Sequence, residues 1–243
     1  MKLSDFKVLT FDCYGTLIDW EAGLSNELRA LVARSRRDMS REQILEEFGR
    51  EEFAQEAETP AMAYSQLLAV VYQRLAKAWG TTTTHEEANI FGASIPDWPE
   101  FPDSAEALRY LKRHYKLVIL SNVDRLSFRS SNARLKVEFD AIYTAQDIGS
   151  YKPSERNFQY MLRRLGEDFG FGRTDVLHVA QSLLHDHAPA NRIGLASAWI
   201  DRRHAAEGWG ATMPPTARPR YDFRFESMAA LADAHRREIG AVV

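Results

Sequence analysis

The chain of 243 residues contains only one cysteine, Cys13, which excludes an internal disulfide framework. Its longest apolar runs are far too short to span a bilayer. The first residues, Met-Lys-Leu-Ser-Asp-Phe-Lys, lack the apolar region of a secretory signal peptide. Together these absences predict a soluble, cytoplasmic protein.

Clustered charge of one sign is also absent. The formal net charge is -3, and the charged residues are spread along the chain. Without a basic block or a polybasic amphipathic segment, we expect neither a nucleic-acid partner nor a membrane surface as partner. With 45% hydrophobic and 27% charged residues, the composition is ordinary for a globular protein. The length suffices for one large domain, or for a core domain that carries an insertion.

Short apolar runs alternate with helical patterns in the first residues and in the second half of the chain. Strands are predicted at 7–10, 116–120, 141–144, 176–180, 196–200 and 222–225. Helices are predicted at 104–113, 125–135, 157–165 and 228–239, with a further helix ending at Asn191. Such alternation predicts an α/β fold with a Rossmann-like, doubly wound parallel sheet.

The segment between the first strand and the rest has a different pattern. Its leucines recur at helical spacing, Ser40 to Gln43 resembles a capping box, and a further helical segment follows at 86–91. A proline-rich stretch at 96–102 ends it. We therefore predict a helical cap at residues 20–98, inserted into a core made of 1–19 and 99–243.

Four groups of reactive side chains follow predicted strands. They are Asp12, the pair Ser121 and Asn122, Lys152, and the run Ser182 to His187. Each alone has a simple structural explanation: a helix cap, a turn, a solvated lysine or a weak zinc signal. Because ligands of open α/β sheets bind beyond the carboxyl ends of the strands, we expect these groups to converge.

Together the four groups could perform nucleophilic catalysis. A carboxylate nucleophile at Asp12 needs a nearby cation to stay ionised, which Lys152 can supply. Ser121 and Asn122 offer donors for an anionic group of the substrate. Asp186 or Ser182 could orient the water that hydrolyses an ester intermediate.

The motifs identify the chain as similar to haloacid dehalogenase superfamily hydrolases over essentially its whole length. Asp12-Cys-Tyr-Gly-Thr-Leu17 resembles the first motif, Ser121 the second, Lys152 the third, and the run from Gln181 to Asp186 the fourth. The resemblance implies a cap after the first strand and a covalent aspartyl intermediate on Asp12. It also implies a homodimer, since related enzymes often are dimers.

Two positions argue against the phosphatases of that superfamily. Tyr14 stands where phosphatases have a second Asp as general acid, and a phenol is a poor substitute. Gln181 replaces the inner acid of the fourth motif, although Asp186 remains at the outer position. Mg²⁺ prefers anionic oxygen ligands, so we expect no metal and no cofactor.

The pattern Asp-Xaa-Tyr-Gly-Thr-Leu is instead that of the (S)-2-haloacid dehalogenases, in which the Asp attacks the α-carbon. Thr16, Ser121, Asn122 and Lys152 match that family's active-site positions, and Arg50 of the cap is the expected halide-binding arginine. The chain departs from the family at Phe158, which stands for a tyrosine, and at Gln181 and Ser182 in the fourth motif.

A closer subgroup resemblance is to azetidine-2-carboxylate hydrolase, a relative that opens a strained four-membered imino acid. It is carried by 11–20, 58–60, 182–187, 198–200 and 202–204. An amine leaves more easily when a proton donor is near, and His185, His187 or Tyr14 could contribute that proton. Trp20 could offer an aromatic face to the ammonium, although a packed core residue is the simpler interpretation of this Trp. We expect a small 2-substituted carboxylic acid as substrate. Ring opening, a Mg²⁺-dependent phosphatase and an inactive binding module remain alternatives to dehalogenation.

Overall fold

The structure is a computed structural model that describes residues 1–240. Six parallel strands form one sheet in the order β3-β2-β1-β4-β5-β6. Their bounds are β1 Val8–Phe11, β2 Lys116–Ser121, β3 Ala141–Thr144, β4 Val176–Ala180, β5 Ala196–Ile200 and β6 Phe223–Phe225. The doubly wound parallel sheet is thus confirmed.

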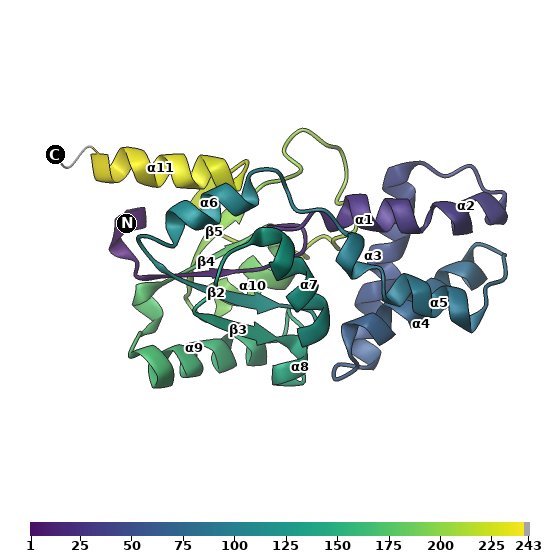
Figure 1. The fold of residues 1–243 in the computed structure, drawn as a ribbon, viewed down its shortest axis with the longest axis horizontal. Helices are drawn as coiled ribbons and strands as arrows, with labels where there is room; N and C mark the ends of the chain where they lie inside the picture. Colours follow the sequence, from purple (N-terminus) through teal and green to yellow (C-terminus); the bar gives the residue numbers. More distant parts are fainter. Residues whose placement is uncertain (241–243) are drawn as a thin grey trace.

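Helices cover both faces of the sheet, as Figure 1 shows with α6 and α11 above it and α9 below it. They are α6 Ser104–Leu111, α7 Arg125–Leu135, α8 Ala145–Ile148, α9 Glu155–Phe169, α10 Ala188–Arg192 and α11 Met228–Gly240. Alternate residues of β1 point to opposite faces: Val8 packs in one hydrophobic cluster with α9, whereas Leu9 packs in another with α6 and α11. Burial on both faces explains why the strands read as continuous apolar runs.

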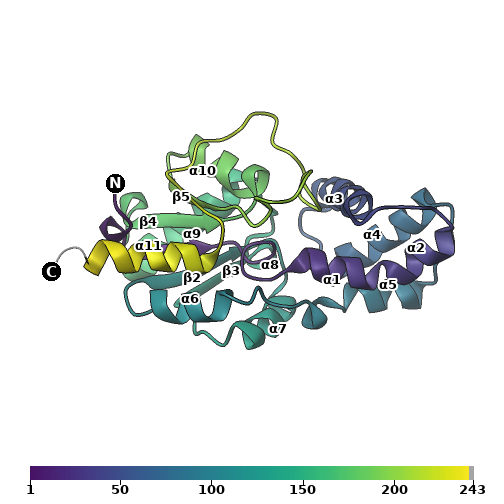
Figure 2. The same ribbon diagram turned by 90° about the horizontal axis from the view of Figure 1, so that it is seen from above.

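The cap is the helical lobe that lies beside the sheet in Figures 1 and 2. Its helices are α1 Trp20–Glu27, α2 Arg29–Ser35, α3 Arg41–Glu58, α4 Tyr64–Ala78 and α5 His85–Gly92. The predicted capping box starts α3: Ser40 Oγ accepts from Gln43 N, and Gln43 Oε1 accepts from Ser40 N. The two connections to the core lie side by side, because Asp19 N donates to Pro99 O and Phe101 N donates to Leu17 O.

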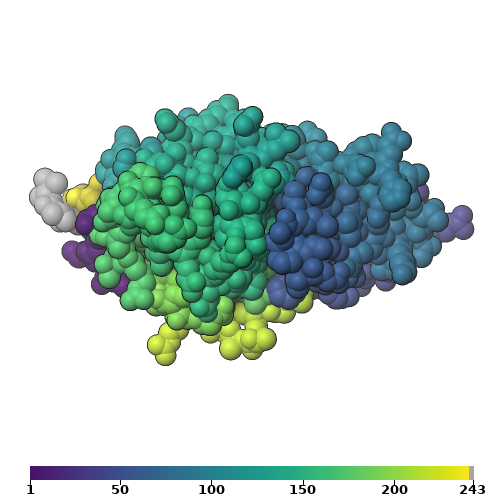
Figure 3. All heavy atoms as spheres, turned by 90° about the horizontal axis from the view of Figure 1, so that it is seen from below, coloured from purple at the N-terminus to yellow at the C-terminus, as the bar shows by residue number. Residues whose placement is uncertain are grey.

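The cap and the core pack against each other directly. In the space-filling view of Figure 3, blue atoms of the cap abut green atoms of the core. The long segment between β5 and β6 also reaches the cap, where Arg203 forms ion pairs with Glu21 of α1 and Glu42 of α3. Within residues 1–240 no helix combines the length and apolar character that a membrane crossing requires.

One local prediction needs correction. The helix predicted to follow β4 is interrupted at its start by a π-helical turn over Leu183–His187, and α10 begins only at Ala188. Such turns occur mostly as local irregularities and frequently at functional sites. Here the turn carries His185 and Asp186, two of the expected site residues.

Candidate active site

The expected reactive groups converge at the carboxyl edge of the sheet. Asp12 directly follows β1, Ser121 ends β2, and Asp186 lies in the π-helical turn after β4. Since β2, β1 and β4 are adjacent in the sheet, their ends lie together. Lys152 reaches the same place from the loop between α8 and α9.

Lys152 is the centre of a buried ion network. Its side chain is only 2% exposed, and its Nζ lies 2.8 Å from Asp12 Oδ1 and 2.7 Å from Asp186 Oδ1. The third donor of the ammonium goes to Leu120 O at 3.1 Å. Burial alone would lower the pKa of Lys152, but Asp12 and Asp186 outweigh this effect and raise it above its usual value. Lys152 therefore stays protonated and places a positive charge next to the Asp12 carboxylate.

Asp12 is held through both of its oxygens. Oδ2 accepts from Thr16 Oγ1 at 2.8 Å, and Thr16 Oγ1 in turn accepts from Gln181 N at 2.9 Å. The turn between them needs Gly15, whose φ of +86° lies in the left-handed region. Burial raises the pKa of Asp12, Lys152 opposes this rise, and the charge of Asp186 adds to it. The carboxylate is thus fixed in position and paired with a cation.

Asp186 is fixed by a histidine that the sequence analysis missed. His178 of β4 is fully buried, and its Nε2 lies 2.9 Å from Asp186 Oδ1 while its Nδ1 lies 2.8 Å from Thr10 Oγ1. Burial alone would raise the pKa of Asp186, but Lys152 and His178 lower it below its ordinary value. The other oxygen, Oδ2, has no hydrogen-bond partner among the described residues. It remains available to a water molecule or a substrate.

A cavity of about 40 Å³ opens onto Asp12 between the core and the cap. Most of the expected site residues line it: Asp12, Tyr14, Trp20, Ser121, Asn122, Lys152, Gln181, Ser182, His185 and Asp186. A cavity of this volume accommodates only a small molecule without movement of its walls. The geometry therefore agrees with a small substrate that lies close to the Asp12 carboxylate.

Thr16, Phe158 and Arg50 were expected at the site but do not line this cavity. Thr16 lies behind Asp12 and acts on it through the hydrogen bond already described. Phe158 is fully buried in the core, where its ring packs edge-to-face on His178 at 5.1 Å, so it contacts no substrate. Arg50 lies on the exposed side of α3, and its assignment as a halide-binding residue is not supported by its position.

Ser121 and Asn122, the polar pair at the end of β2, differ in their hydrogen bonding. Asn122 is engaged with protein: Oδ1 accepts from Lys152 N at 2.7 Å, and Nδ2 donates to Lys152 O and to Glu56 Oε1, both at 3.0 Å. Asn122 thus positions the lysine loop and connects it to the cap. Ser121 Oγ is buried and has no hydrogen-bond partner among the described residues. This hydroxyl is therefore free to donate to a ligand in the cavity.

The cap contributes two acids that the sequence analysis did not identify. Glu52 and Glu56 of α3 line the cavity, and both are at least 94% buried. Tyr64 of α4 donates to Glu52 Oε1 at 2.6 Å. The sequence offers one signal for them: they continue the apolar stripe of Leu45 and Phe48 along the buried face of α3.

Tyr14 and the two histidines of the fourth motif have defined partners. The Tyr14 hydroxyl lies 3.0 Å from Ser131 Oγ, and burial raises its pKa well above the usual value, so the phenol stays neutral. His187 is buried away from the cavity, with Ser197 Oγ at 2.9 Å and Ala180 O at 3.0 Å. His185 lines the cavity, and burial lowers its pKa to about 4. Neither histidine is placed to hold zinc.

The residues at the fourth motif do not fit a magnesium ion. Both oxygens of Asp12 and one oxygen of Asp186 are already bound by Lys152, Thr16 or His178. The inner position holds the neutral amide of Gln181, whose Oε1 accepts from Thr212. Within residues 1–240 no group of three His, Cys, Asp or Glu side chains is arranged to bind a metal.

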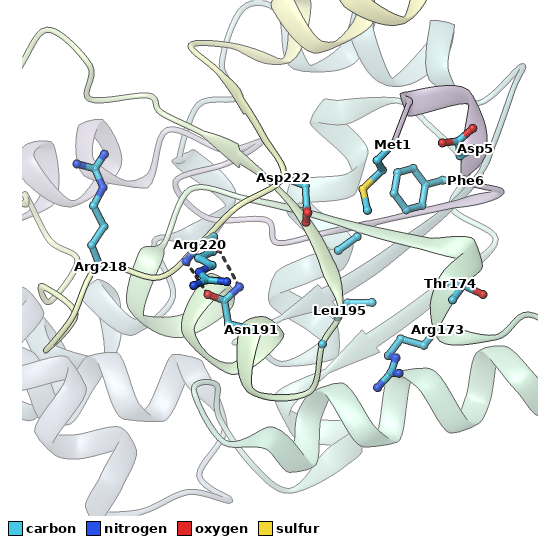
Figure 4. A pocket seen from close by; sticks show the side chains of 12 residues that line it. Met1, Asp5, Phe6, Arg173, Thr174, Asn191, Leu195, Arg218, Arg220 and Asp222 are labelled. Atoms are coloured by element: carbon cyan, nitrogen blue, oxygen red, sulfur yellow. Dashed lines mark hydrogen bonds between the residues drawn. The ribbon is translucent and has the colours of Figure 1, made fainter.

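A larger cavity of about 900 Å³ lies elsewhere, and Figure 4 shows the side chains around it. Its residues include Phe6, Thr174 and Leu195, which precede β1, β4 and β5. It therefore lies at the opposite edge of the sheet from Asp12. The side chain of Asn191 donates a hydrogen bond to Arg220 O and accepts one from Arg220 N. None of the residues that line this cavity is a nucleophile with an adjacent base. The small cavity at Asp12 remains the candidate active site.

The sequence matches the family model of haloacid dehalogenase-like hydrolases over residues 6–180. An (S)-2-haloacid dehalogenase of Pseudomonas putida is 28% identical over 109 residues, which cover 44% of this chain and 46% of that protein. Another from Pseudomonas sp. (strain YL) is 31% identical over 110 residues, 44% of each chain. The match thus spans less than half the length of these relatives.

Solved structures resemble the whole fold. The L-2-haloacid dehalogenase of Xanthobacter autotrophicus with chloropropionic acid covalently bound has a TM-score of 0.76 at 18% identity, covering 95% of this chain and 98% of that one. A HAD-hydrolase of Bacillus subtilis bound to magnesium has a TM-score of 0.71 at 16% identity, with coverages of 94% and 97%. At such identities the likeness establishes the fold.

Proposed function

Because the chain belongs to the haloacid dehalogenase-like hydrolase family, we propose that it is a metal-independent hydrolase in which Asp12 attacks a carbon atom of a small 2-substituted carboxylic acid. The observation that carries this proposal is the network in which Lys152 joins Asp12 to Asp186. It presents an oriented, charge-paired carboxylate to a small cavity, beside a fourth motif that does not fit magnesium. Both features favour displacement at carbon over phosphate transfer.

In the first step, an oxygen of Asp12 forms a bond to the substrate carbon, and the bond to the leaving group breaks with its electron pair. Ser121 Oγ can donate to the substrate carboxylate, since the hydroxyl lines the cavity and has no partner among the described residues. The result is an ester between Asp12 and the substrate. Thr16 and Lys152 fix the Asp12 carboxylate by hydrogen bonds. The nucleophile is thus already oriented, which lowers the entropic part of the activation free energy of this step.

In the second step, water attacks the carbonyl carbon of the Asp12 ester, and the bond between that carbon and the ester oxygen breaks. The negative charge that develops on the carbonyl oxygen lies next to Lys152 Nζ. Asp186 Oδ2, buried and without a partner among residues 1–240, can accept a hydrogen bond from the attacking water. The departing oxygen takes one proton of the water and becomes the hydroxyl group of the product, the other proton is released, and the Asp12 carboxylate is regenerated.

The leaving group distinguishes two candidate reactions. Dehalogenation of a 2-haloacid is favoured by the names of the matched relatives, which are 2-haloacid dehalogenases. Opening of a strained cyclic imino acid is favoured by the cap wall, where Glu52 and Glu56 stand and Arg50 is absent. Both reactions use the same attack by Asp12.

Single turnover in ¹⁸O-labelled water tests the shared mechanism. With excess enzyme and either 2-chloropropionate or azetidine-2-carboxylate, we expect ¹⁸O in Asp12 by peptide mass spectrometry, and none in the Asp12→Asn variant. Turnover without label in Asp12 would refute the ester intermediate. Mg²⁺-dependent hydrolysis of p-nitrophenyl phosphate would support a phosphatase, and absence of every reaction would support a binding module.

A further inference from the structure

His178 is a polar residue inside an otherwise apolar strand. It lies in β4 between Leu177 and Val179, and its side chain is fully buried. Its ring packs edge-to-face on Phe158, with the ring centroids 5.1 Å apart. An imidazole in such surroundings is costly unless its ring nitrogens are hydrogen-bonded, so the partners of this ring decide what it can do.

Both ring nitrogens of His178 have partners, and one partner belongs to the candidate active site. Thr10 and His178 face each other in the register of β1 and β4, and His178 Nδ1 lies 2.8 Å from Thr10 Oγ1. His178 Nε2 lies 2.9 Å from Asp186 Oδ1. An ionised carboxylate only accepts hydrogen bonds, so Nε2 carries a proton and donates to Asp186. Thr10 thus holds the ring on one side, and the ring holds Asp186 on the other.

The two donors that reach Asp186 bind the same oxygen. Oδ1 accepts from Lys152 Nζ at 2.7 Å as well as from His178, whereas Oδ2 is buried and has no hydrogen-bond partner among residues 1–240. Asp186 lines the cavity beside Asp12. Buried polar atoms are normally satisfied, so Oδ2 requires a partner that enters the cavity, and the water that hydrolyses the ester would be one.

An ester on Asp12 changes the charges that face Lys152. In the free protein Lys152 Nζ lies 2.8 Å from Asp12 Oδ1 and 2.7 Å from Asp186 Oδ1, so two carboxylates share one ammonium. The ester has no negative charge, and of these two residues only Asp186 then faces the ammonium as an anion. The ammonium attracts both oxygens of Asp186, and bidentate pairing would occupy the Oδ2 that the attacking water needs.

We infer that His178 is a positioning residue for hydrolysis of the ester, the second step of the proposed reaction. By binding Oδ1, His178 opposes rotation of the Asp186 carboxylate toward Lys152 and keeps Oδ2 directed at the cavity. This inference rests on the proposed attack by Asp12 and assigns a residue to only one of its two steps.

His178 does not exchange a proton in this step. The water oxygen forms a bond to the carbonyl carbon of the Asp12 ester, and the bond from that carbon to the ester oxygen breaks with its electron pair. The departing oxygen takes one proton of the water, and the other proton is released. His178 keeps the proton on Nε2 throughout, because its role is to hold Asp186 in place.

The test separates the two steps, with whichever of 2-chloropropionate and azetidine-2-carboxylate labels Asp12 in ¹⁸O-labelled water. Substrate consumption in the first turnover reports the attack by Asp12, and peptide mass spectrometry of acid-quenched samples reports the ester. His178→Leu should slow ester hydrolysis on the order of 30-fold, the effect of losing a hydrogen bond to a charged group. Substrate consumption should then show a burst equal to the enzyme concentration, and the ester should accumulate on Asp12.

Three further variants separate positioning from folding. His178→Gln retains an amide nitrogen close to the place of Nε2 and should restore most of the hydrolysis rate. Thr10→Val matches the shape of threonine but removes the partner of Nδ1, so it should also accumulate ester, and it serves if His178→Leu does not fold. His235→Leu removes another buried histidine, which is bonded to the Tyr110 hydroxyl between α6 and α11, and should accumulate no ester.

The outcomes distinguish the inference from the proposed function. Ester that accumulates in His178→Leu or Thr10→Val, but not in His235→Leu, would support a positioning role. Equal slowing of both steps, or hydrolysis at the wild-type rate in both His178→Leu and Thr10→Val, would overturn that role while the attack by Asp12 stands. If neither compound labels Asp12 of the wild type, the proposed attack fails and the inference fails with it.

Discussion

Glu52→Gln should make the protein more stable at neutral pH. Burial raises the pKa of Glu52 from 4.5 to about 8 in the folded chain, although the Tyr64 hydroxyl opposes the rise. An acid whose pKa is higher in the folded state favours folding below its unfolded-state pKa, and this contribution is lost as the pH rises toward the folded-state pKa. The loss for Glu52 therefore falls between pH 4.5 and about pH 8. Glutamine has nearly the same shape and cannot ionise, so it avoids the loss.

The size of the effect follows from the pKa difference. Each pH unit between the unfolded and folded pKa values costs about 1.4 kcal/mol, so the wild type loses about 3 kcal/mol between pH 4.5 and pH 7 relative to the Gln variant. In a chain of this length that corresponds to a Tm difference of roughly 6–12 °C. Tyr64 can still donate to the side-chain oxygen of glutamine, so its hydrogen bond is retained.

Urea denaturation of both proteins at pH 5, 6, 7 and 8 measures the difference. The two curves of unfolding free energy against pH should diverge as the pH rises, with the variant above the wild type. Glu46→Gln, on the exposed side of α3, should stay parallel to the wild type. Parallel curves for Glu52→Gln would show that Glu52 ionises freely in the folded protein, and the expected rise of its pKa through burial would be refuted.

Three further predictions concern other parts of the molecule. EDTA should leave turnover unchanged, and activity that returns only with Mg²⁺ would contradict a metal-independent reaction. Lys152→Met leaves Asp12 and Asp186 as buried like charges and should lower the unfolding free energy by about 3–5 kcal/mol, so a loss below about 1 kcal/mol by urea denaturation would be inconsistent with the ion network. Gly49→Ala places a Cβ 2.2 Å from Ala211 O, where α3 meets the segment after β5, and should cost about 1–3 kcal/mol through overpacking. A Tm equal to that of the wild type would show that the backbone at Ala211 moves away at little energetic cost.

The core of the fold and the position of Asp12 could be predicted because simple rules govern them. Parallel strands are buried on both faces, so their apolar runs are visible in the sequence, as at 176–180. Reactive residues that follow such strands gather at one edge of the sheet. That rule brings Asp12, Ser121 and Asp186 together, although 174 positions separate the first from the last. The sequence does not reveal which of their atoms are paired and which are free.

The cap wall could not be predicted for a physical reason. Helix α3 is rich in glutamate, and only the rotation of the helix separates Glu52 and Glu56, which face the cavity, from Glu46, which faces solvent. Arg50 lies two positions before Glu52, yet on a helix that spacing turns it away from the cavity. A resemblance in the core motifs does not determine this rotation. His178 was missed for a similar reason, because a histidine inside an apolar strand resembles an ordinary core residue.

The choice of leaving group therefore depends on the cap more than on the core motifs. Asp12 and Lys152 would serve equally well for displacement of a halide or of a ring nitrogen. With Glu52 and Glu56 on the cap wall and Arg50 outside the cavity, substitutions in the cap, assayed on a halogenated and on a cyclic substrate, distinguish the two leaving groups that the core motifs leave open.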